Sequence, residues 1–157
     1  MKHYIQILNL LFILVASLIE TGCSQKVYPT AKVNYLSGNS ETITMRAIGM
    51  GIDRYAAITN AELNAIDVVF FRGLPESEQK TALVGSNEAE ERSKNEKYFS
   101  EFYDNKRYKT FVMSSIPVSN LVRITRREKN ITVDVKINIT ALRKDLEQFN
   151  IIRKFGY

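Results

Sequence analysis

The chain has 157 residues, of which 25% are charged and 45% are hydrophobic. This composition fits one globular domain with appended segments, and it excludes a disordered or collagen-like chain. The chain contains a single cysteine, which excludes an intrachain disulfide, so the core must hold without one.

The net charge is +5, from 22 Lys and Arg against 17 Asp and Glu, and such an excess favours anionic surfaces. Most basic residues are interspersed with acidic ones, but two basic clusters stand out: Lys106, Arg107 and Lys109, and Arg123, Arg126, Arg127 and Lys129. Nucleic-acid sites usually show denser basic stripes. We therefore interpret both clusters as solvated edges of strands and helices, and we expect no nucleic-acid partner.

The N-terminus has the features of a secretory signal. Lys2 and His3 precede residues 4–19, which carry no charge. As a helix this run would span about 24 Å at about 1.5 Å per residue, less than the ~30 Å of a bilayer core. A basic start, a short apolar run and small residues after it predict a signal peptide over residues 1–22.

Thr21, Gly22 and Cys23 resemble the lipobox of bacterial lipoproteins, in which a peptidase cuts before a cysteine that carries a diacylglycerol thioether. The resemblance implies lipidation at Cys23 and a membrane anchor of two or three acyl chains, which binds durably. Glu20 departs from the pattern, which has an apolar residue, commonly leucine, at that position. The alternative is an uncleaved signal anchor with an incidental cysteine.

The lipoprotein resemblance also carries a sorting rule, under which aspartate after the cysteine retains a protein at the inner membrane. Ser24 stands there instead, and no acidic cluster follows in residues 24–29. We therefore expect a lipid-anchored protein at the bacterial outer membrane that faces the periplasm. Residues 23–40 are small and polar, and they predict a lipidated N-terminus and a tether.

Residues 41–157 are expected to form one α+β domain, a mainly antiparallel sheet with helices packed on one face. Alternation predicts a first strand over residues 41–48. Gly49 and Gly51 are expected to break it, and Asp53 to cap a helix that ends at Gly73. This helix should pack through an apolar stripe formed by Ala57, Ile58, Ala61, Ala65, Ile66 and Val69.

The remaining elements follow as a helix, a hairpin and a closing helix. Residues 88–104 predict a second helix, and residues 108–113 the start of a strand. Residues 117–126 and 130–139 predict a hairpin, because Val133, Val135, Ile137 and Ile139 alternate with polar residues. Residues 141–155 predict an amphipathic helix on Leu142, Leu146 and Phe149.

Catalytic motifs are weak. Gly49 and Gly51 could begin a dinucleotide fingerprint, but its third glycine position holds Arg54, so we interpret them as a strand-to-helix turn that needs glycine torsions.

The single histidine, His3, lies in the signal, which excludes a histidine-dependent triad or a common zinc site from the mature domain. The carboxylate groups Glu76 and Glu78, and Glu88, Glu90 and Glu91, fit solvated loops and a helix start. We expect no enzyme, cofactor or metal.

Aromatic and basic residues alternate between Lys94 and Phe111. Such a mixture is typical of a protein contact surface or a stacking site, although helical spacing favours core packing for about half of the aromatics. We expect the contact residues to be Tyr103, Arg107 and Tyr108.

The segment TMRAIGMGIDRYAAITNAELNAIDVVFFRGLP, residues 44–75, resembles the core of small bacterial outer-membrane lipoproteins of about twenty kilodaltons. The same domain occurs at the N-terminus of a flagellar-ring-associated periplasmic protein. The shared residues are Gly51, Arg54, Ala57, Ala61 and Ala65.

This resemblance implies the fold and an envelope role without catalytic residues. The sequence therefore predicts a protein that binds or scaffolds within an outer-membrane-associated assembly, of secretion or motility type. The alternative is a periplasmic small-ligand carrier or an enzyme accessory domain.

Overall fold

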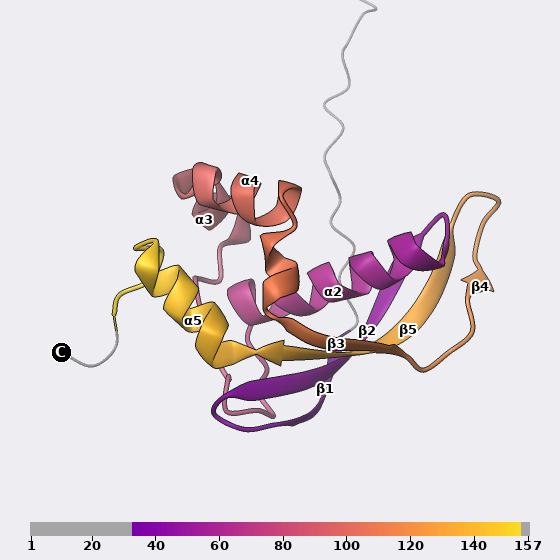
Figure 1. The fold of residues 1–157 in the computed structure, drawn as a ribbon, viewed down its shortest axis with the longest axis horizontal. Coiled ribbons are helices and arrows are strands. Elements are labelled where there is room, and N and C mark those ends of the chain that lie inside the picture. The colour runs from indigo at the N-terminus through magenta and orange to yellow at the C-terminus, as the bar shows by residue number, and fades with distance from the viewer. Residues whose placement is uncertain (1–32, 155–157) are drawn as a thin grey trace, which may run out of the picture.

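The computed structural model describes residues 33–154, so the predicted signal, Cys23 and most of the predicted tether lie outside the described residues. The described part is an α+β fold, a five-stranded antiparallel sheet with helices above it (Figure 1). The strands are β1 (Val33–Gly38), β2 (Thr42–Gly51), β3 (Val112–Pro117), β4 (Val122–Arg123) and β5 (Lys129–Asn138). They lie in the order β1-β2-β5-β3, and β4 also pairs with β5.

Five helical segments complete the described chain: α2 (Arg54–Phe71), α3 (Glu88–Lys94), α4 (Glu96–Asp104), the short 3-10 helix η1 (Arg107–Thr110) and α5 (Ile139–Gln148). Within residues 33–154, none of these combines the length and apolar character that a membrane-spanning helix requires.

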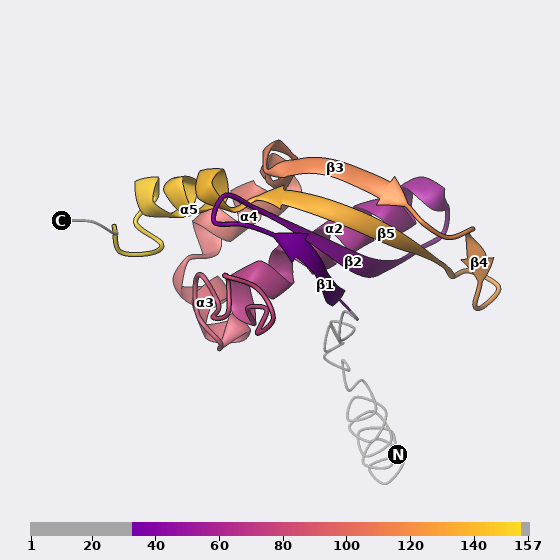
Figure 2. The ribbon, with the colours of Figure 1, turned by 90° about the horizontal axis from the view of Figure 1, so that it is seen from below.

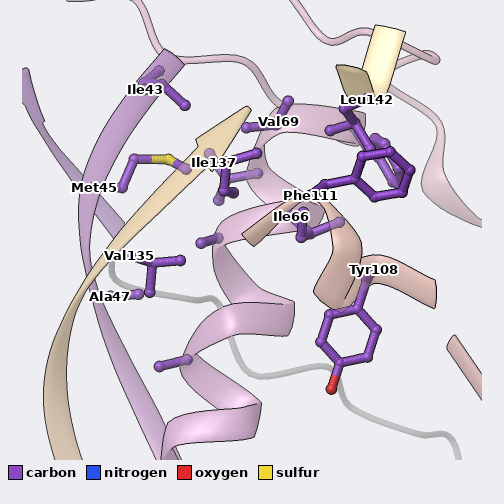
Figure 3. Close-up of a cluster of buried hydrophobic side chains, with 14 of the residues drawn as sticks. Ile43, Met45, Ala47, Ile66, Val69, Tyr108, Phe111, Val135, Ile137 and Leu142 are labelled. Atoms are coloured by element: carbon purple, nitrogen blue, oxygen red, sulfur yellow. The ribbon is translucent and has the colours of Figure 1, made fainter. Parts of the chain in front are cut away.

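The centre of the sheet is the pair β2 and β5, which run antiparallel over their full length, from Thr42 opposite Asn138 to Gly51 opposite Lys129. Successive side chains of a strand point to opposite faces. The buried set on the helix side contains Ile43, Met45, Ala47, Ile131, Val133, Val135 and Ile137 (Figure 3). The predicted alternation in the last strand is thus confirmed, except that Ile139 already belongs to α5.

Helix α2 lies on this buried face, at the position where the sequence predicts a helix. Asp53 is its N-cap, and the carboxylate accepts a hydrogen bond from the Ala56 amide at 2.8 Å. Ala57, Ala61 and Ala65 are fully buried. At the other end Gly73 has a φ of +73°, a conformation that glycine adopts without strain.

Gly49 and Gly51 have a role different from the predicted one. Both belong to β2, Gly49 inside it and Gly51 as its last residue, and Gly73 is the only described glycine with positive φ. A Cβ on Gly49 would lie 1.9 Å from the Ala57 carbonyl oxygen, and a Cβ on Gly51 would lie 2.5 Å from the Ala57 amide nitrogen. The glycines are therefore needed because the α2 backbone rests directly on β2, and the predicted torsional reason is wrong.

A second layer of aromatic side chains packs on the side of α2 away from the sheet. Phe70 of α2 contacts Phe99 and Phe102 of α4, with ring centroids 6.0 and 5.2 Å apart. Phe71 contacts Phe99 at 5.7 Å. The C-terminal part of α2 is consequently buried on both sides, between the sheet and α4 (Figures 1 and 2).

The folded part of the chain starts earlier than the sequence indicates. Residues 33–38, assigned to the tether, form the edge strand β1, in which Val33 pairs with Ala47 and Gly38 with Ile43. Asn39 turns the chain into β2, because its side-chain oxygen accepts hydrogen bonds from the amides of Glu41 and Thr42. The ordered domain therefore includes residues 33–40.

Three other predicted elements are corrected. The expected helix over residues 88–104 is two helices that meet at Asn95. Residues 108–113 begin as η1, after Lys106 in a left-handed conformation, and the strand starts only at Val112. The main hairpin partner of β5 is β3, whereas the expected 117–126 segment contributes only the last residue of β3, Pro117, and the two-residue strand β4.

The contact between β2 and α2 predicts that Gly49→Ala is strongly destabilising. The new methyl group would meet backbone atoms that cannot move independently, so we expect a loss of at least about 3 kcal/mol, at the upper end of overpacking effects. Urea unfolding followed by circular dichroism measures it. Gly85→Ala is the control, since its Cβ would meet only the flexible Glu91 side chain. Equal stability of the two variants would contradict the direct backbone contact.

Candidate functional site

The predicted contact residues Tyr103, Arg107 and Tyr108 do not form one exposed surface. Tyr108 is only 1% exposed and belongs to the hydrophobic core (Figure 3). This burial removes it from the predicted contact surface. Tyr103 and Arg107 are partly buried, and each is held by an aspartate far away in the sequence.

Arg107 connects the helical layer to α5. Its Nη2 atom donates to both carboxylate oxygens of Asp145, at 2.7 and 2.8 Å. The Tyr98 hydroxyl donates to the same carboxylate at 2.8 Å, and the guanidinium lies 4.6 Å from the centre of the Phe149 ring. Burial, reinforced by Asp145, raises the pKa of Tyr98. Arg107 thus links η1 to α5, which is a structural role.

Lys109 is also engaged inside the molecule. Its ammonium group lies 3.0 Å from the carboxylate of Glu62, which is 6% exposed and also accepts from the Ser115 hydroxyl at 2.8 Å. Burial alone would lower the pKa of Lys109, but Glu62 outweighs it and the pKa is raised. Two of the three cations in the first basic cluster are therefore neutralised by ion pairs with α2 and α5.

A polar groove of about 580 Å³ lies between α2 and the pair α3 and α4. One wall is formed by α2 residues that include Asn64 and Asp67, and the other by Arg92, Phe99 and Tyr103. Four carboxylates and two guanidiniums line it: Asp67, Glu88, Glu96 and Asp104, and Arg72 and Arg92. The excess of carboxylates favours a cationic or hydroxyl-rich ligand over an anionic one.

Three side chains at the base of this groove form a closed network. The Tyr103 hydroxyl donates to Asp67 and accepts from Arg92 at 3.2 Å, while Arg92 donates to Asp67 at 3.0 Å. Arg92 also donates to Glu88 at 3.0 Å, and its guanidinium lies 4.5 Å from the centre of the Tyr103 ring. The network joins α2 to both α3 and α4, so it stabilises the groove as well as lining it.

Burial governs the acid–base properties of this network. It raises the pKa of Asp67, although the hydrogen bond from Tyr103 and the charge of Arg92 oppose the shift. Burial and the nearby Asp67 carboxylate raise the pKa of Tyr103 well above its ordinary value. A raised carboxyl pKa beside a neutral phenol is an arrangement that a ligand site can use, but burial in a purely structural network also produces it.

The other candidate surface lies on the opposite side of the molecule, at the β3 edge. Five large aliphatic side chains between residues 113 and 124 are 45–60% exposed: Met113, Ile116, Val118, Val122 and Ile124. In the described part of the chain, β3 pairs with β5 on one side and with no strand on the other. An exposed apolar strip on an open edge is typical of a protein interaction site.

Ile116 places part of this strip on the helix-free face of the sheet. It pairs with Asp134 of β5, which in turn pairs with Arg46 of β2. Arg46 binds Asp134 through two hydrogen bonds, of 2.7 and 2.9 Å. The hydrogen bond from Arg46 lowers the pKa of Asp134. This face therefore offers an apolar side chain beside a fixed ion pair.

Sequence reasoning missed the β3 strip and, apart from Tyr103, the groove, for identifiable reasons. The β3 strip is apolar, and apolar residues near a predicted hairpin are normally assigned to the core. The groove depends on Asp67, which lies inside the apolar helix pattern and belongs to no recognised motif. A carboxylate interrupting an otherwise buried stripe, as Asp67 and Glu62 do, is the one signal that could have identified these positions.

The predicted carboxylate groups lie mostly where the sequence places them. Glu88, Glu90 and Glu91 occupy the first turn of α3, where negative charge is favourable, and Asn87 is the N-cap. Glu88 additionally binds Arg92, four residues further along the helix. The residues of the predicted lipidation site at Cys23 lie outside the described part.

Comparison of the chain with known protein families, with curated proteins and with solved structures found no match. The resemblance to small outer-membrane lipoproteins therefore stays a prediction from residues 44–75.

The groove network predicts a pH-dependent stability difference between the wild type and Asp67→Asn. The folded pKa of Asp67 is raised above the unfolded value of about 4. The unfolded state therefore releases this proton first, and the free energy of unfolding of the wild type falls relative to the variant as pH rises from about 4 through the raised pKa. Urea unfolding between about pH 4 and pH 8 measures this difference.

Tyr103→Phe provides a second test of the raised pKa of Asp67. It removes a hydrogen bond that lowers the Asp67 pKa, so the fall should extend to higher pH in this variant. Parallel stability curves for all three proteins would show that Asp67 titrates normally.

Proposed function

We propose that this chain is a lipid-anchored protein of the bacterial outer membrane, facing the periplasm, that binds another protein of an envelope assembly and has no catalytic role. The supporting features for the anchor are in the sequence: the apolar run of residues 4–19, the small residues before Cys23, and Ser24 after it. A secretion or motility machine is the setting that the resemblance of residues 44–75 suggests.

The observation that carries the binding role is the exposed aliphatic strip along β3. Ile116 is 60% exposed, and the exposed Met113 and Val118 flank it on the same strand and its continuation. Burying such side chains against a partner is favourable by about 25 cal/mol per Å² of apolar surface. The open edge of β3 could also accept backbone hydrogen bonds from an added strand.

The surroundings of Ile116 match the composition of a protein interface. A typical interface has an apolar centre with a polar rim. Here the Arg46–Asp134 ion pair borders Ile116 on the helix-free face, and Ser114 pairs with Lys136 next to it. Edge strands are usually protected from pairing by charge or by proline. On β3 only the last residue, Pro117, has this effect.

The anchor is tested by replacing the thiol. Cys23→Ser removes the only sulfur that can carry the thioether, so the protein should leave the outer-membrane fraction and its mass should lose the lipid. Fractionation and intact-mass measurement of the protein from its native cells detect both changes. Ser24→Ala is the matched control and should remain lipidated. If Cys23→Ser fractionates like the wild type, with the same added mass, the proposed anchor is wrong.

The partner surface is tested with Ile116→Lys, which places a charge in the centre of the strip. Crosslinking in the native envelope, followed by mass spectrometry, should identify a protein bound to the wild type and show at least a tenfold lower yield for the variant. Leu36→Lys is the control, since Leu36 is 41% exposed on β1, the opposite edge of the sheet. Equal loss in both variants, or none in either, would contradict a partner at β3.

The groove supports a second candidate function, a small-ligand carrier. Its volume and its carboxylate-rich lining fit a small polar molecule. Native mass spectrometry of the protein purified from its own cells would detect a retained ligand. A ligand that Glu96→Gln and Asp104→Asn release would favour the carrier.

A further inference from the structure

The loop that contains β4 forms a separate projection, which we call the finger and define as residues 119–128. It extends beyond the N-terminal end of α2 in both ribbon views (Figures 1 and 2). A short ladder supports its outer part, in which Val122 pairs with Asn130 and Arg123 with Lys129. Its base is held by Leu121, which packs against the core, and by the Ser119 hydroxyl, which accepts a hydrogen bond from the Thr132 amide at 2.9 Å. At the tip, the amides of Ile124 and Thr125 donate to the Glu128 carbonyl oxygen at 2.9 and 3.0 Å.

The finger carries the three arginines of the second basic cluster, and their surroundings differ from those of the first cluster. Arg123, Arg126 and Arg127 are exposed, and none of them forms an ion pair with another residue of the described chain. In the first cluster, by contrast, Arg107 binds Asp145 and Lys109 binds Glu62. The guanidiniums of the finger are therefore available to an external anion, and Glu128 is the only acidic residue among them.

The finger also exposes aliphatic side chains that serve no internal packing. Val122 and Ile124 are both 52% exposed and flank Arg123 in the sequence; Val122 and Arg123 form β4, and Ile124 follows it. The finger thus places exposed aliphatic and cationic side chains next to one another, whereas a merely solvated loop would need only polar ones.

We infer that the finger binds the anionic headgroups of the bilayer that holds the lipid anchor, an inference that rests on the anchor in the proposed function. Guanidinium groups bind phosphate oxygens through paired hydrogen bonds. Aliphatic side chains next to them enter the boundary between headgroups and acyl chains. An anionic lipid surface satisfies both kinds of side chain together, and polybasic segments near a membrane anchor are attracted to such surfaces.

The register of the sheet places the finger near the start of the tether. Val33, the first described residue, pairs with Ala47 of β2, and three residues further along β2 Met50 pairs with Asn130, the partner of Val122. Three residues of a strand span about 10 Å, and β1 and β4 are separated sideways by three strand spacings of about 4.8 Å each. The ten residues from Cys23 to Val33 reach at most about 35 Å. The anchored bilayer is consequently within reach of the finger.

The test uses the absence of tryptophan from the chain, because a single introduced tryptophan then reports on one position. Lipidated full-length Ile124→Trp is reconstituted into phosphatidylcholine vesicles with or without phosphatidylglycerol. With phosphatidylglycerol we expect a blue shift of the emission and quenching by brominated acyl chains. Phe149→Trp is the control and should show neither change, because Phe149 is 43% exposed and directly follows α5, which lies at the other end of the molecule from β4 (Figure 1).

Charge dependence separates the finger from the anchor. Combining Ile124→Trp with Arg123→Gln, Arg126→Gln and Arg127→Gln should abolish the shift and the quenching while the protein still floats with the vesicles. Far-UV circular dichroism should be unchanged, since all three arginines are exposed.

Three results would overturn the inference: no shift with phosphatidylglycerol, an equal shift in the glutamine variant, or the same shift caused by duplex DNA without lipid. If the protein floats but its finger stays in water, only the finger contact fails. A chain that carries no lipid and does not float overturns the proposed anchor and the finger contact together.

Discussion

The close approach of α2 to β2 determines the position of every other layer. At Gly49 no side chain separates the strand from the helix, and Ala57 and Ala61 present only methyl groups to it. This contact brings the helix down onto the centre of the sheet. The aromatic residues of α4 can then pack on the far side of α2 through Phe70, while the Asp67 network forms above it. The groove and the buried core both depend on this short distance between α2 and β2.

The central elements could be predicted because their local patterns and their tertiary environment agree. β5 is buried on one face only, so strict alternation survives in its sequence, and Asp53 and Gly73 mark the limits of α2 by their own side-chain and backbone chemistry. β1 could not be predicted in this way. Its residues VNYLSG resemble a linker, and they become a strand only because the edge of β2 is available for pairing.

The sites were harder to predict than the fold for a related reason. The sequence around a tyrosine or arginine near other aromatics is the same whether the side chain contacts a partner or an internal carboxylate. Arg107 and Tyr103 donate hydrogen bonds to Asp145 and Asp67, which lie 38 and 36 residues away in the sequence. Ile116 raises the opposite problem, since nothing local distinguishes an exposed isoleucine on an edge strand from a buried one.

The position of β1 has a mechanical consequence. The chain enters the domain through this strand, which is largely exposed and joins the rest of the sheet through β2 alone. Its pairing is irregular between Tyr35 and Ser37. Any tension between an N-terminal attachment and the domain is therefore carried first by the β1–β2 hydrogen bonds and by Val33 and Tyr35, which pack against the core. Strand β1 would therefore be the first part of the domain to detach under such a load.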